Sequence, residues 1–115
     1  MALAGLVLCG CTTNADIVAS RLIASTSSSR PPSTVADCIY SAAVGISEGL
    51  DVRKMSIGSA IHVSADQGGH KLALYDVSVE PTDKGSIVSI RAASNVWGGT
   101  NEPPELHLIV ERCAK

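Results

Sequence analysis

The sequence predicts an α+β domain in which three or four antiparallel strands form a sheet and an N-terminal and a C-terminal helix pack on one of its faces. Three observations predict this fold: an apolar stripe at helical spacing after residue 34, alternation of apolar and polar residues over 53–97, and a second apolar stripe after residue 104. The chain of 115 residues is 45% hydrophobic and 17% charged, which suits one domain of ordinary globular composition.

The first helix is indicated by both its start and its periodicity. Thr34 follows a Pro-Pro-Ser run and offers a hydroxyl cap, and Asp37 lies in the first turn. Gly49 follows as a stop signal. The apolar residues between these limits recur at spacings of three and four: Val35, Cys38, Ile39, Ala42 and Ile46.

The middle of the chain predicts an antiparallel meander. Segment 53–66 alternates with period two and is interpreted as one strand, bulged at Gly58. Segments 70–80 and 86–97 alternate in the same way. Turn-forming residues at 66–69 and 81–85 separate the segments, and connections of this length favour antiparallel pairing.

The last segment, 100–115, fits two structures. As a strand it places alternating apolar residues on one face. As a helix it forms an apolar stripe, with Thr100 or Asn101 as the cap and prolines in the first turn, where their missing N–H costs little. The prolines favour the helix. The stripe comprises Leu106, Ile109, Val110 and Cys113.

The opening residues suggest a signal for export and lipid attachment. An apolar run, Ala2 to Leu8, precedes Leu8-Cys9-Gly10-Cys11, which resembles the bacterial lipobox, and by this resemblance Cys11 is the lipidated residue. The alternative is a short buried strand with a coincidental cysteine pair. Segment 12–33 contains STSSSRPPS and predicts a flexible linker. The expected organisation is therefore 1–11 signal remnant and lipobox, 12–33 linker and 34–115 compact domain.

This layout resembles small bacterial envelope lipoproteins of unassigned function. The resemblance implies attachment to a membrane through Cys11, at the outer membrane or its periplasmic face. In that oxidising compartment Cys9 would be removed with the signal peptide and Cys11 blocked by lipid, which leaves Cys38 and Cys113 to form a disulfide. Two separate buried thiols are the alternative.

Composition and spacing argue against several other classes. A formal net charge of −2 and only three aromatic residues do not suit nucleic-acid binding. The histidines, His62, His70 and His107, are dispersed and are interpreted as solvent-facing, so neither a metal nor another cofactor is expected. The stretch Gly45-Ile46-Ser47-Glu48-Gly49 fits G-x-S-x-G, but it follows a helix rather than a strand, which predicts a solvated Ser47.

The sequence thus favours a monomeric, non-enzymatic envelope lipoprotein acting as a structural or interaction module, open to antibodies as a surface antigen if it faces outward. A second hypothesis is a module that binds a small ligand or an envelope component through the loop from Trp97 to Glu102. Its binding residues would be Trp97, Tyr75 and Asn101, although Trp97 also suits a space-filling role between strand and helix. A remote alternative is a small hydrolase, which would need a histidine beside Ser47.

Overall fold

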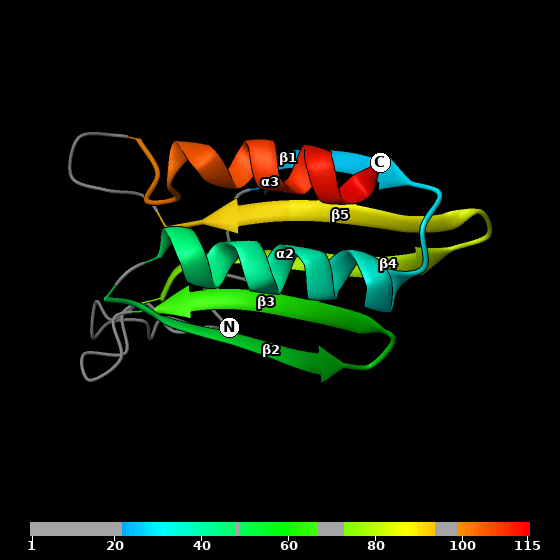
Figure 1. Cartoon of the computed structure of the whole chain (residues 1–115), viewed down its shortest axis with the longest axis horizontal. Coiled ribbons are helices and arrows are strands. Elements are labelled where there is room, and N and C mark those ends of the chain that lie inside the picture. The colour runs from blue at the N-terminus through cyan, green and yellow to red at the C-terminus, as the bar shows by residue number, and fades with distance from the viewer. Residues whose placement is uncertain (1–21, 48, 67–72, 94–98) are drawn as a thin grey trace, which may run out of the picture.

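The computed structural model describes residues 22–47, 49–66, 73–93 and 99–115, which form a five-stranded antiparallel sheet with two helices on one face (Figure 1). The predicted α+β class and helix placement are confirmed, with five strands instead of three or four. In chain order the elements are β1 Leu22–Ser28, α2 Pro32–Ile46, β2 Asp51–Ile57, β3 Ala60–Asp66, β4 Ala73–Thr82, β5 Gly85–Ala92 and α3 Pro104–Ala114.

The strand order across the sheet is β1-β5-β4-β3-β2. Strands β2 to β5 form an antiparallel meander of four strands where the sequence predicts three, because segment 53–66 divides into β2 and β3. Strand β1, which was not predicted, comes first in the chain and pairs with β5, the last strand. This pairing places β1 and β2 at the two edges of the sheet.

Strand β1 corrects the predicted linker over 12–33. Leu22 to Ser28 is extended and forms a ladder with β5, with Thr26 opposite Val88. A polar segment can form a strand here because the edge of a sheet supplies backbone hydrogen-bond partners and demands little apolar surface. The compact domain therefore includes β1, and the predicted boundary at residue 34 is wrong.

The predicted bulge at Gly58 is a hairpin turn between β2 and β3. Gly58 has a positive φ of 63°, which glycine adopts readily, and Ile57 pairs with Ala60 across the turn. Odd-numbered residues of β2 therefore share a face with even-numbered residues of β3. As a result Met55 lies on the face away from the helices, whereas Val63 lies beneath them.

The hydrophobic core fills the space between the helices and the sheet. Helix α2 starts at Pro32 rather than at Thr34, and α3, confirmed as a helix, starts at Pro104; neither has a side-chain cap hydrogen bond. Their first turns contain prolines, whose fixed φ suits the start of a helix. The largest fully buried apolar side chains are Tyr75, Ile39, Ile90, Leu106, Val35, Val63, Val77, Val79, Val88 and Val110.

Candidate functional site

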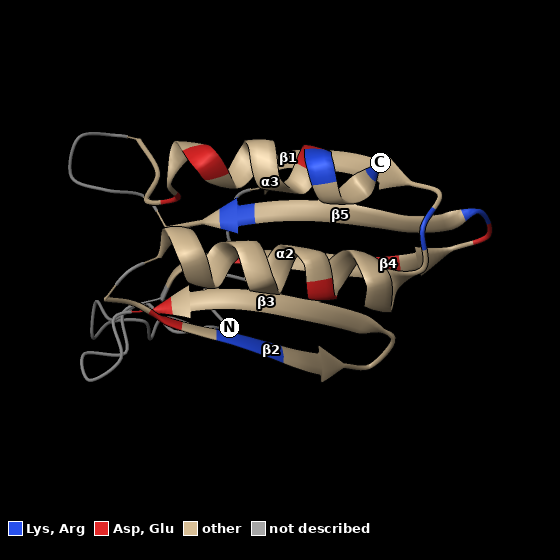
Figure 2. Ribbon diagram, viewed as in Figure 1, with Lys and Arg blue, Asp and Glu red and all other residues tan. Residues whose placement is uncertain are grey.

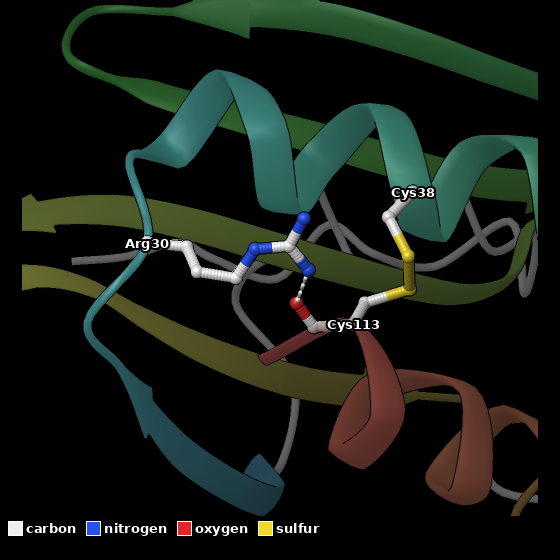
Figure 3. Close-up of a disulfide and its surroundings, with 3 residues drawn as sticks. All are labelled: Arg30, Cys38 and Cys113. Atoms are coloured by element: carbon white, nitrogen blue, oxygen red, sulfur yellow. Dashed lines mark hydrogen bonds between the residues drawn. A yellow bond between two sulfur atoms is a disulfide. The ribbon is translucent and has the colours of Figure 1, made fainter. Parts of the chain in front are cut away.

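The predicted disulfide between Cys38 and Cys113 is present. It joins α2 to α3 with a Cα–Cα distance of 5.7 Å, inside the usual range for disulfides (Figure 3). The two cysteines are 75 residues apart in the sequence, so the bond closes a loop that contains most of the domain.

Arg30 adds polar contacts at the same end of the molecule. Its Nη1 donates to the carbonyl oxygen of Cys113 at 2.8 Å (Figure 3), where the guanidinium also suits the negative end of the α3 dipole. Its backbone N–H donates to Ser28 Oγ at 3.0 Å, and Ser86 Oγ donates to its carbonyl oxygen at 2.6 Å. Arg30 thus connects β1, β5 and α3. Sequence reasoning missed it because it lay in the predicted linker.

A hydrogen-bonded polar cluster occupies the opposite face of the sheet. His62 and Ser64 on β3 and Asp76 on β4 point away from the helices, because they alternate with core residues of the same strands. Ser64 Oγ donates to Asp76 Oδ1 at 2.6 Å. His62 Nδ1 lies 3.1 and 3.0 Å from the two carboxylate oxygens of Asp76. Asp76 is only 2% exposed and His62 only 7%.

The order of partners in this cluster decides what chemistry it suits. In a serine hydrolase the nucleophilic hydroxyl is hydrogen-bonded to the imidazole, and the carboxylate lies behind the imidazole. Here Asp76 stands between Ser64 and His62, so the serine proton is directed to the carboxylate. The cluster fixes the His62 ring through Nδ1, and Nε2 is the ring nitrogen outside this contact.

The cluster corrects the prediction that His62 is solvent-facing, because the side chain is buried against Asp76. Alternation alone places His62 and Asp76 on the outward face of their strands, as expected. Their contact depends on the register of β3 against β4, in which Ser64 lies opposite Asp76. The predicted turn at 66–69 does not give this register, because β4 begins only at Ala73 and pairs there with Asp66.

Tyr75 does not line a surface site. It is 0% exposed, and its hydroxyl is hydrogen-bonded to Ser47 Oγ at 2.9 Å. Burial raises the pKa of Tyr75, and the Ser47 hydrogen bond opposes this shift only in part. Ser47 is itself buried, so the prediction of a solvated serine is also wrong. The two residues join the end of α2 to the sheet.

The other predicted site residues are distributed as follows. The N–H of Asn101 donates to the carbonyl oxygen of Ala93 at 2.9 Å, which ties the segment before α3 to the end of β5. Trp97 and the predicted lipidation residue Cys11 lie outside the described residues.

Glu102 and His107 are in hydrogen-bond contact at the start of α3, with 3.0 Å between Glu102 Oε2 and His107 Nε2. Partial burial acts to raise the pKa of Glu102. Hydrogen bonds from Thr100, His107 and the Glu102 backbone, together with the charge of His107, outweigh burial and leave this pKa lowered.

Charges of both signs are intermixed on the helices and along the sheet in the view of Figure 2. Within the described ranges, no three His, Cys, Asp or Glu side chains are grouped so as to hold a metal ion. Among the described residues, no helix is long and apolar enough to span a membrane.

Comparison of the chain with protein-family models, with curated proteins and with solved structures finds no match. Any function assigned to it therefore rests on the residues and contacts of the chain itself.

Proposed function

We propose that the chain is an exported protein of the bacterial cell envelope, anchored to a membrane through lipid on Cys11, whose domain acts as a non-enzymatic interaction module. The Cys38–Cys113 disulfide is the observation that carries this proposal. Disulfides persist in exported proteins and are rare in the reducing cytosol. The lipobox-like residues before Cys11 support the same location.

Two contacts favour an interaction module over the hydrolase alternative. The hydroxyl of Ser47, the serine of the G-x-S-x-G match, is bonded to Tyr75 inside the core. The hydroxyl of Ser64 is bonded to Asp76 rather than to His62. His62, Asp76 and Ser78 at the centre of the open sheet face, opposite the helices, are buried, so the surface available to a partner in the envelope is the less buried part of that face on β5 and β2.

Intact mass of the protein from the membrane fraction, measured with and without reduction, tests the anchor and the disulfide together. We expect a chain that starts at Cys11, carries the mass of attached lipid and gains two hydrogens on reduction. The matched control is Cys11→Ser, which should remove the lipid and leave the gain on reduction unchanged. A chain that retains its first ten residues and carries no lipid would contradict the anchor.

A photo-crosslinking amino acid placed on the open face tests the interaction. Ser89 lies on that face on β5, and Glu105 is an exposed residue of α3 that serves as the control. We expect a discrete crosslinked product in intact cells from position 89 and none from position 105. Equal crosslinking from both positions would argue against a specific surface.

A further inference from the structure

The two edges of the sheet differ in how far they are protected. Strand β1 has a register irregularity between Leu22 and Ala24 and lies beside α3. Strand β2 pairs with β3 through seven consecutive residues without any irregularity and contains no proline. Native proteins usually protect a regular edge strand with a bulge, a proline, charges or a covering element. Strand β2 carries charges and contacts α2 on its helix side, but it has neither a bulge nor a proline.

The backbone of β2 offers hydrogen-bonding groups on its free side. The two-residue turn makes Ile57 and Ala60 the closing hydrogen-bonded pair, and hydrogen-bonded and non-hydrogen-bonded pairs then alternate along the ladder. The N–H and C=O groups of Val52, Lys54 and Ser56 therefore point away from β3. The described part of the chain supplies no backbone partner for them.

On the face opposite the helices, β2 presents the ion-paired Asp51 and Arg53 at one end and two exposed apolar side chains at the other. Met55 is 37% exposed and Ile57 is 54% exposed, and both project from the face opposite the helices. Lys54 projects to the helix side, where its Nζ is bonded to the Asp37 carboxylate and lies 5.8 Å from the centre of the Tyr40 ring. The lysine charge is thus paired with α2 and does not project into the solvent beside the free edge of β2, where it would oppose pairing with another strand.

We propose that β2 pairs antiparallel with β2 of a second copy of this chain, about a two-fold axis at Met55, to give a continuous ten-stranded sheet. This register places Met55 opposite Met55, Arg53 opposite Ile57 and Lys54 opposite Ser56. Lys54 and Ser56 then exchange backbone hydrogen bonds. The Met55 pair is non-hydrogen-bonded, so its Cα atoms approach to about 4.5 Å and bury both thioethers.

Charge disfavours two of the symmetric alternatives. Centring the axis on Lys54 places two lysines opposite each other, and centring it on Arg53 places two arginines in a close non-hydrogen-bonded pair. Like charges directly opposite each other destabilise a strand pair. The Met55 register avoids both conflicts and buries Met55 and Ile57, the two exposed large apolar side chains of β2.

Cysteine crosslinking tests both the pairing and its register. The full chain carrying Cys9→Ser and Cys11→Ser retains only the disulfide cysteines, and the test is then independent of the lipid anchor. Met55→Cys in this background should give a disulfide-linked dimer within minutes of mild oxidation. Lys54→Cys and Val44→Cys, two exposed positions away from the proposed close pair, should give at least tenfold less dimer. Equal dimer yield from all three positions would overturn the proposal.

Sedimentation of the same chain without an added cysteine provides the second measurement. We expect concentration-dependent dimerisation that Met55→Lys abolishes, because it places two ammonium groups opposite each other, and that Val44→Lys leaves unchanged. Circular dichroism confirms that both variants fold. A chain that stays monomeric at all concentrations would overturn the proposal, and the β2 edge would then be left to an extended segment of a different protein.

Discussion

Adjacent residues of β4 show how differently the two faces of the sheet use polar groups. Tyr75 points toward the helices and bonds to Ser47, so its hydroxyl joins the sheet to the end of α2. Asp76 points the other way and bonds to His62 and Ser64, both on the neighbouring strand β3. On the helix side a polar contact connects two layers, whereas on the open side it connects two strands already held by their ladder.

Under the proposed function, this difference separates the face that stabilises the fold from the face that meets a partner. On the helix side, buried apolar groups and the disulfide stabilise the fold, because they hold the two helices against the sheet. On the open side, the polar cluster satisfies its own members and leaves the face without a covering helix. Substitutions on the two faces should therefore differ in size.

The largest effect is expected from the disulfide. The double variant Cys38→Ala/Cys113→Ala should lose about 4 kcal/mol of unfolding free energy, because the unfolded chain is no longer closed across a separation of 75 residues. Urea unfolding followed by circular dichroism measures this loss. Reductant should lower the stability of the parent protein and leave the variant unchanged; a loss below 1 kcal/mol would contradict a stabilising bridge.

Neighbouring residues of β5 compare the two faces directly. Ile90→Ala removes a buried side chain beneath the helices and should cost about 3 kcal/mol. Ser89→Ala changes the open face and should alter stability by less than about 0.5 kcal/mol. Both are measured by urea unfolding. Equal losses would show that the open face is also part of a packed interface.

Asp76→Ala tests the polar cluster itself. It leaves the buried donors of His62 and Ser64 without their acceptor and should cost about 2 kcal/mol. Asp76→Asn retains one carbonyl acceptor and should cost about half as much. Thermal unfolding of the two variants provides the comparison, and a neutral Asp76→Ala would show that the cluster is solvated in solution.

Tyr75→Phe leaves the buried Ser47 hydroxyl without its partner and should cost about 1 kcal/mol near neutral pH. The substitution should also change how the free energy of unfolding depends on pH in the alkaline range. Because the folded-state pKa of Tyr75 is raised, the unfolded chain loses its proton first, and stability declines as pH rises above the ordinary value of 10.0. The free energy of unfolding, measured between pH 8 and 11, should decline less steeply in Tyr75→Phe than in the parent protein.

Glu102 should give the smallest effect. Its lowered pKa contributes stability that is present above the ordinary carboxyl value and is lost as pH falls through the folded-state value. Solvent screening keeps this contribution to a few tenths of a kcal/mol, about 0.3. Glu102→Gln should therefore flatten the acid limb slightly, while Glu105→Gln, an exposed neighbour, should not. A larger effect of Glu105→Gln would argue against the His107 pairing.

The sequence predicted those parts of the structure that local periodicity determines. Apolar spacing placed α2, whereas the spacing of the last segment fitted a strand as well and the prolines favoured α3. The apolar stripes of both helices contain the two cysteines that form the disulfide. Turn residues at 81–85 located the β4–β5 hairpin. These features depend on neighbours close in sequence, which a single chain displays.

The parts that sequence reasoning missed depend on pairing over distance. Strand β1 has only three apolar residues, at its start, and it forms because β5 offers an edge, which no local pattern in the sequence indicates. The His62–Asp76 contact needs the β3–β4 register, and Arg30 acts only where the end of α3 meets it. Gly58 was interpreted as a bulge because alternation continues through a two-residue turn without a break in the apolar pattern.

The covalent topology also sets an order for partial unfolding. The disulfide encloses everything between Cys38 and Cys113, whereas β1 lies before the enclosed loop and is held by its ladder with β5, by packing and by the contacts of Arg30. A tether at the N-terminal end would transmit any pull first to β1, the strand that no covalent ring protects. A pulling force could thus detach β1 and extend the chain by the length of that strand, while the disulfide keeps the two helices linked.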